Sequence, residues 1–203
     1  MTSLDPRCII LDVPGMRPLI NSIEAEYRRY KALGEGAIGQ LGDAELSAPG
    51  LNGGNSIVVI VWHLSGNLAS RFTDFLTSDG EKPWRHREEE FAARTVTRAG
   101  LMEKWRQGWG VLFEALAGLT DDHLQQQVTI RGQFLAVHDA LHRSLAHTSY
   151  HVGQIVYLAK SQRGAEWRSL SIPLGGSTAY NQNPTLDRLD WHAADLDHSA
   201  DDQ

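Results

Sequence analysis

The sequence predicts an all-α protein, a single-domain four-helix bundle, and three observations support this. Apolar residues recur at three- and four-residue spacing in four long stretches, which is the pattern of amphipathic helices. Signals for β-strands are few, and there is no internal repeat or clear linker. With 203 residues, of which 41% are hydrophobic, the chain can form one sizeable core. We therefore expect one domain over residues 1–203, with its folded core at about 15–182.

The first helix is expected from near Met16 to about Leu41. Pro18 is compatible with this because a helix tolerates proline in its first turn. Gly34 and Gly36 are residues that can break or fray the far end. The apolar stripe of this helix comprises Leu19, Ile20, Ile23, Tyr27 and Tyr30.

The second helix is expected at 57–76, after a loop rich in glycine and asparagine at 47–55. Asn55 or Ser56 can cap its first turn. The apolar run Ile57–Val61 on its own would also fit a buried strand. The pattern continues for about twenty residues without a turn signal, however, and that length favours a helix.

A long polar excursion separates the second and third helices. Residues 77–94 contain Asp79, Gly80, Pro83 and a charged run, and we expect this segment to cross the surface. The third helix follows, and Gly118 lies near its end. Its apolar stripe comprises Leu101, Trp105, Trp109, Leu112 and Leu116.

A small extended turn at Val128–Gln133 leads to the fourth helix, which is expected from about Leu135 to Lys160. Beyond Gly164 the chain is rich in serine and glycine and should form an irregular C-terminal tail. The acidic end, about 195–203, is expected to be disordered.

Composition and charge exclude several classes of function. The net charge is −6 and the pI is about 5.8, so a basic surface for nucleic acid or for an anionic membrane is not expected. Cys8 is the only cysteine, which rules out an intramolecular disulfide and a cysteine-based zinc site. Signal-peptide and membrane-spanning patterns are absent, so we expect a cytoplasmic protein. Its expected partner is a small-molecule substrate, and a homodimer remains open.

Histidines provide the strongest functional signal. His147 and His151 lie four residues apart, so on a helix both imidazoles face one side and can reach one metal ion. His63, deep in the apolar second helix, is the third candidate. His138 and His142 share the spacing but lie half a turn out of phase with His147 and His151, and His138 is one residue out of step with the apolar stripe. Three nitrogen ligands leave coordination positions open, which is typical of a reactive metal rather than a structural one.

The competing interpretation is that these histidines are polar bundle residues hydrogen-bonded to neighbours. A histidine pair at this spacing is a short pattern, and alone it does not distinguish metal ligands from hydrogen-bonded bundle residues. His63 favours a metal, because an unpaired polar group in an apolar helix is costly. No glutamate directly follows His147, so the metalloprotease pattern is absent, and the Glu-x-x-His pairs of di-iron bundles are missing. No residue stands out as a general base.

Two motifs resemble the DinB-like superfamily of four-helix-bundle metalloproteins, which includes YfiT-type proteins and thiol-dependent S-transferases. They are Trp62–Asn67 (WHLSGN) and His147–Ile155 (HTSYHVGQI). Within the superfamily the chain is most similar to a branch of uncharacterised bacterial proteins, through Arg71–Trp84 and Ser171–Ser177. The resemblance covers about residues 15–182. It implies the bundle fold and no contact with DNA, and its ligand positions fall on His63, His147 and His151.

The expected cofactor is a divalent transition ion, with zinc or nickel preferred and iron or copper as alternatives. Because imidazoles are neutral, the ion keeps its charge and favours an anion at the open positions. A bound thiol can then act as thiolate, and the resemblance implies a transferase that adds a low-molecular-weight thiol to an electrophilic small molecule. Activation of water instead would give a metal-dependent hydrolase. A non-enzymatic metal-binding stress protein is the third alternative.

Five further residues are candidates for orienting the histidines or for binding substrate. Asn67 lies one helical turn beyond the histidine of the second helix, and Gln154 lies three residues beyond the last ligand. Arg71 lies two turns beyond the first ligand and could pair with an anionic substrate. Tyr180 and Asn181, in the irregular tail, could fold over the mouth of the site. Structural hydrogen bonds or ion pairs are the alternative for each of them.

Overall fold

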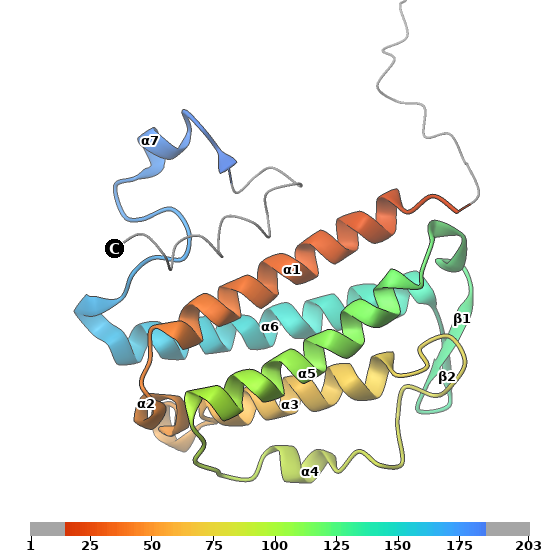
Figure 1. Ribbon diagram of the computed structural model, residues 1–203, viewed down its shortest axis with the longest axis horizontal. Coiled ribbons are helices and arrows are strands. Elements are labelled where there is room, and N and C mark those ends of the chain that lie inside the picture. The colour runs from red at the N-terminus through yellow and green to blue at the C-terminus, as the bar shows by residue number, and fades with distance from the viewer. Residues whose placement is uncertain (1–14, 186–203) are drawn as a thin grey trace, which may run out of the picture.

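The computed structural model describes residues 15–185, and in this part of the chain four long helices lie side by side as a bundle (Figure 1). The prediction of an all-α bundle is confirmed. Its helices are α1 (Pro18–Gly39), α3 (Ile57–Phe72), α5 (Arg98–Ala117) and α6 (Val137–Arg163). Cys8 and the acidic end at 195–203 lie outside the described residues.

Short elements connect the bundle helices. Strands β1 and β2 pair antiparallel in a hairpin, with Val128 opposite Leu135. No helix among residues 15–185 combines the length and the apolar character needed to cross a membrane. The short elements are α2 (Asp43–Ser47), η2 (Leu51–Gly53), α4 (Arg87–Glu90), η3 (Asp121–His123), β1 (Gln127–Ile130), β2 (Gln133–Ala136), η4 (Gly164–Glu166) and α7 (Ser177–Tyr180).

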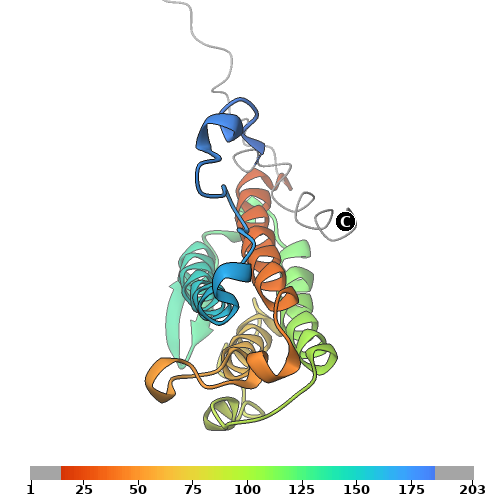
Figure 2. The same ribbon diagram turned by 90° about the vertical axis from the view of Figure 1, so that its left-hand side faces the viewer.

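Helix α3 is the centre of the packing. It lies along α5 and also contacts α6 and α4, while α1 packs on α6 (Figure 2). The approach of α5 to α3 is closest at Gly108, where a Cβ atom would lie only 2.6 Å from Cα of Ser65. Trp105 and Trp109 of α5 are almost fully buried and fill the core beside this contact. The close packing holds α3 in a fixed position in the bundle.

The two glycines expected to fray the first helix do not do so. Helix α1 continues through Gly34 and Gly36 to Gly39. A Cβ atom on Gly34 would lie 2.6 Å from the ring of Trp105, and one on Gly36 would lie 2.8 Å from the side chain of Leu170. Both glycines therefore serve as packing positions within the helix, and the contacts they permit offset their low helix propensity.

Two other predicted boundaries differ from the structure. Helix α3 ends at Phe72 rather than near 76, because Asp74 adopts a positive φ of 49° that a helix cannot continue through. The fourth helix begins two residues after Leu135, which instead belongs to β2 of the hairpin. It extends to Arg163, where Gly164 adopts a positive φ of 54° and ends it.

The polar segment 77–94 does more than cross the surface. The carboxylate of Asp79 accepts hydrogen bonds from three backbone N–H groups: Glu81 at 2.7 Å, and Arg131 and Gly132 at 2.8 Å. The last two form the turn of the β1–β2 hairpin, so this carboxylate fastens the segment to the hairpin. At its other end, helix α4 packs against α3.

Candidate metal centre

Three imidazoles meet between α3 and α6. The first turn of α3 is capped by Ser56, whose side chain accepts a hydrogen bond from the N–H of Val59. Further along this helix, His63 lies inside the bundle and is only 5% exposed. Nε2 of His147 lies 3.3 Å from Nε2 of His63 and 3.1 Å from Nε2 of His151. One ligand atom from each ring can be chosen so that all three lie within 4.8 Å of one another. The structure thus brings together the histidines singled out in the sequence.

Hydrogen bonds on the far side of two rings determine which nitrogens face the centre with a lone pair. Nδ1 of His63 lies 2.9 Å from Oε2 of Glu90, and Nδ1 of His151 lies 2.8 Å from Oε1 of Gln154. Both oxygens are acceptors, so each Nδ1 carries the proton and each Nε2 carries the lone pair. The lone pairs of His63 and His151 therefore both point at Nε2 of His147. A single N–H at that nitrogen cannot donate a full hydrogen bond to both of them.

The spacing of the three nitrogens fits a shared cation. Two nitrogens bound to one tetrahedral zinc at about 2.0–2.1 Å lie about 3.3 Å apart. The two measured separations, 3.3 and 3.1 Å, agree with this value. A cation at the centre would accept all three lone pairs at once, whereas hydrogen bonding among neutral rings leaves a central nitrogen poorly satisfied. The residues present therefore fit a three-histidine metal site.

Burial keeps the imidazoles of α6 in the form that binds metals. Burial, together with the neighbouring His151 and His63, lowers the pKa of His147 to about 4. Burial also lowers the pKa of His151, although the hydrogen bond to Gln154 opposes this. Both rings are accordingly neutral at neutral pH, and metal binding there need not displace a proton from either.

Glu90 is the most important residue that the sequence reasoning missed. It lies at the end of α4 in the segment expected to be on the surface, yet it is only 8% exposed. Besides accepting from His63, it receives two hydrogen bonds from the guanidinium of Arg85, at 2.8 and 2.9 Å. Burial alone would raise the pKa of this carboxyl, but the bonds from His63 and Arg85 outweigh it and lower the pKa. Glu90 therefore remains ionised and orients His63.

Two neighbours complete the contact between α4 and α3. Gly66 lies one turn after His63, and a Cβ atom there would be 2.2 Å from Oε1 of Glu90. Only glycine leaves room for the carboxylate at that position. The ring of Phe91 lies against the imidazole of His63, with ring centroids 4.7 Å apart. The segment 77–94 thus covers the outer side of the centre.

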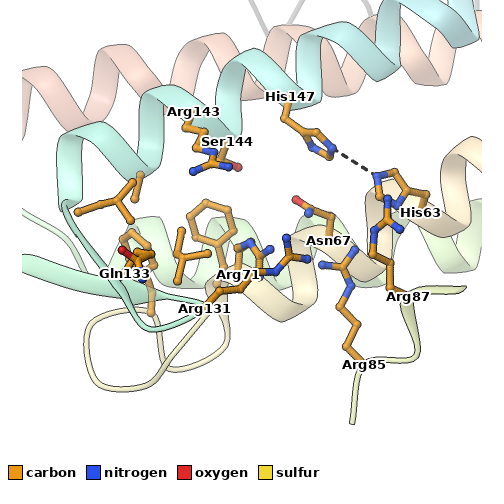
Figure 3. Close-up of a pocket in the computed structure, with 15 residues that line it drawn as sticks. His63, Asn67, Arg71, Arg85, Arg87, Arg131, Gln133, Arg143, Ser144 and His147 are labelled. Carbon is orange, nitrogen blue, oxygen red and sulfur yellow. Dashed lines mark hydrogen bonds between the residues drawn. The ribbon is translucent and has the colours of Figure 1, made fainter. Parts of the chain in front are cut away.

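A cavity of about 350 Å³ opens beside the histidines (Figure 3). Its walls come from α3, α6, the hairpin and the polar segment, and its polar side chains are mainly basic. The lining residues are His63, Asn67, Arg71, Phe72, Phe75, Arg85, Arg87, Ile130, Arg131, Gln133, Leu135, Ala140, Arg143, Ser144 and His147. No carboxylate is among them. Substrate could reach the histidines through this cavity.

A comparison with known protein families assigns the chain to one of them. A family model described as "Protein of unknown function (DUF1572)" matches residues 16–176, which include all four bundle helices. The chain belongs to this family. No curated protein matches the chain. The three-histidine cluster lies within the matched range and is compatible with the DinB-like resemblance. Because the family description states no activity, the function has to be argued from the site.

The other residues predicted for the site lie at different distances from the histidines. Asn67 and Arg71 line the cavity, and Gln154 holds His151 through the hydrogen bond described above. Tyr180 and Asn181, which were expected to lie over the mouth, are not among the lining residues. Figures 1 and 2 both show α7 beyond α1, on the side of the bundle away from α4.

The second histidine pair of α6 lies apart from the centre, as its helical phase predicts. Nδ1 of His138 is 2.9 Å from the backbone oxygen of Leu124. His142 is exposed, and its ring contacts His138 at a centroid separation of 6.3 Å. Neither residue belongs to the cluster that could hold a metal ion.

Proposed function

We propose that the protein binds one divalent transition ion through His63, His147 and His151, and that it is a transferase adding a low-molecular-weight thiol to an electrophilic small molecule. The observation that supports this most strongly is the convergence of the three Nε2 atoms. Glu90 and Gln154 hold two of the rings in the tautomer that directs a lone pair inward. Zinc or nickel is preferred, with iron and copper as alternatives.

The roles of the protein side chains follow from their positions. When bound, a divalent ion would lower the pKa of a thiol at an open position so that it is present as thiolate. Glu90 and Gln154 keep the imidazoles in place, and Phe91 covers the ring of His63. The cavity beside the centre provides space for an electrophile next to the sulfur, and holding both reactants together accelerates transfer.

The composition of the cavity favours thiol transfer over the hydrolase alternative. Hydrolysis generally uses a general base or acid to move protons to the leaving group. No Asp or Glu lines the cavity within the described part of the chain. The carboxylate that contacts His63, that of Glu90, has both oxygens engaged by His63 and Arg85. A thiol bound as thiolate would already have released its proton to solvent, and an electrophile that loses a stable anion such as a halide needs no proton delivered to its leaving group.

Cobalt-substituted protein tests the proposal directly. Titration with 2-mercaptoethanol should produce a sulfur-to-cobalt charge-transfer band in the wild-type protein and in the His138→Ala/His142→Ala double variant. The band should be absent in His147→Ala. If no band forms while ester hydrolysis depends on the same three histidines, the hydrolase alternative replaces this proposal. If metal binds but neither reaction is found, the protein is a non-enzymatic metal binder.

A further inference from the structure

Five arginines gather around the cavity of a protein whose net charge is −6. They come from α3, α4, α6, the hairpin turn and the segment before α4. Figure 3 shows that these side chains and the two labelled histidines border the same cavity. The five are Arg71, Arg85, Arg87, Arg131 and Arg143. This local concentration of positive charge runs against the overall acidity and calls for an explanation.

Ion pairs within the protein satisfy only part of this positive charge. Glu90 pairs fully with Arg85, and Arg87 pairs with an exposed glutamate on its own helix. Arg71 and Arg131, however, share the single carboxylate of Glu81, at 3.3 and 2.8 Å. Within residues 15–185, Arg143 has no ion pair. Three guanidinium groups thus border the cavity with one carboxylate between them.

The structure holds two of these arginines in defined positions. The side chain of Arg71 is half-buried and donates hydrogen bonds to the backbone oxygen of Gly80 and to Glu81. Burial lowers the pKa of this arginine and Arg85 lowers it further, although Glu81 opposes both. Arg131 lies in the hairpin turn that Asp79 fastens through backbone hydrogen bonds. Fixed guanidiniums recognise planar or tetrahedral oxyanions through paired N–H donors.

The metal-binding end and the arginine end are aligned along α3. His63, Asn67 and Arg71 follow one another at four-residue intervals and so occupy the same face of the helix. Eight residues correspond to a rise of about 12 Å between the first and the last. Phe72, Phe75, Ile130 and Leu135 contribute apolar wall between and around the polar groups. A ligand that reaches both ends must therefore be elongated, with an anionic group at one end.

We propose that the cavity binds the oxyanion group, a carboxylate or a phosphate, of the small molecule that reacts at the three-histidine centre, and that Arg71, Arg131 and Arg143 hold it. This inference rests on the proposed function for the reactive end of the ligand, but the anion site itself does not require the metal. It names the substrate class as an acid rather than a neutral or cationic compound.

The test uses calorimetric titration of the full chain after removal of metal with a chelator. Succinate and inorganic phosphate are the probes, each with wild-type protein and with Arg131→Gln and Arg143→Gln. We expect binding that weakens about tenfold in each variant and weakens further with added salt. Arg106→Gln is the matched control, because this exposed arginine lies on α5 outside the cavity and should leave binding unchanged. Equal affinity in all four proteins would overturn the inference.

The two probes and a second titration separate the remaining outcomes. Binding of succinate alone assigns a carboxylate ligand, binding of phosphate alone assigns a phosphorylated one, and binding of neither overturns the inference. In cobalt-substituted protein, the elongated thiol 8-mercaptooctanoate should bind about tenfold more tightly than its neutral counterpart 8-mercapto-1-octanol, and both Arg→Gln variants should remove this preference. If the two thiols bind equally, the sulfur site stands and the anion site is wrong. If anions bind but no thiol band appears, the anion site stands and the thiol proposal fails.

Discussion

The bundle helices and the polar segment 77–94 contribute different parts of the same centre. Helices α3 and α6 supply the three nitrogen atoms, from side chains whose direction follows from helical periodicity. The polar segment supplies Glu90, Arg85 and Phe91, which lock the orientation and cover the outer side. The helices therefore determine whether a metal could bind, and the segment determines how rigidly the first ligand is held. Four predictions test this division, from the largest expected effect to the smallest.

Loss of Glu90 should have the largest effect. Glu90→Ala would leave the buried guanidinium of Arg85 without its carboxylate and Nδ1 of His63 without an acceptor. We expect the free energy of unfolding to fall by about 3–5 kcal/mol and zinc affinity to fall about 10–100-fold. Denaturant unfolding and competition with a zinc chelator measure the two. Glu89→Ala, on the exposed side of the same short helix, should change neither.

Gly66→Ala tests the same contact from the helix side. Alanine normally stabilises a helix by about 0.8–1 kcal/mol relative to glycine. Here its Cβ atom would displace Glu90, so we expect a net loss of about 1–2 kcal/mol and weaker zinc binding. The control is Gly110→Ala, at an exposed position of α5 with open space around it, which should raise the melting temperature. A stabilised Gly66→Ala protein with normal zinc affinity would show that Glu90 is not held against α3.

Gln154→Ala removes the orienting group that α6 itself supplies, and its effect can be compared with that of Glu90→Ala. The amide of Gln154 is neutral and only partly buried, so its loss should cost less than loss of Glu90. We expect zinc affinity to fall about tenfold while the free energy of unfolding changes by less than about 1 kcal/mol. The same chelator competition measures the affinity. An effect as large as that of Glu90→Ala would contradict the greater importance assigned to the polar segment.

The smallest expected effect concerns how pH changes the hydrogen bonds by which the Asp79 carboxylate fastens the polar segment to the hairpin. Backbone hydrogen bonds, first that of Glu81, lower the pKa of this carboxyl below its ordinary value of 3.8. A carboxyl whose folded-state pKa is lowered contributes stability above its unfolded pKa and loses it as pH falls through the folded pKa. The difference in unfolding free energy between wild type and Asp79→Asn should therefore shrink as pH falls below 3.8. A constant difference would mean that ionisation of Asp79 does not hold the hairpin.

The parts of the centre that could be predicted from sequence are those governed by periodicity. The face of α6 that carries His147 and His151 follows from the positions of the apolar residues around them. The continuation of the pattern for about twenty residues without a turn signal predicts α3 as a helix. Glu90 could not be chosen in the same way. It is one of three consecutive glutamates, Glu88–Glu90, in a segment without periodicity, so nothing local distinguishes it. The only hint was that a buried His63 needs an acceptor for its second nitrogen.

Long-range contacts explain what the sequence could not show elsewhere. Arg71, Arg131 and Arg143 belong to three different elements, and only the fold brings them to one cavity. The tail was expected near the site mouth, but its start is attached to the end of α1. There Gln40 exchanges two hydrogen bonds with the backbone of Arg168, at 2.9 and 3.0 Å. The two residues lie more than a hundred positions apart in the chain, so no local sequence pattern could have predicted their contact.

The metal content of histidine variants tests the central claim most directly. Protein purified without added metal should contain about one divalent transition ion per chain by elemental analysis. Single His63→Ala, His147→Ala and His151→Ala variants should each lose most of it, whereas His138→Ala/His142→Ala should keep it. Unchanged metal content in His63→Ala would remove that residue from the site. Loss of metal in His138→Ala/His142→Ala with retention in His147→Ala would show that the other face of α6 holds the ion.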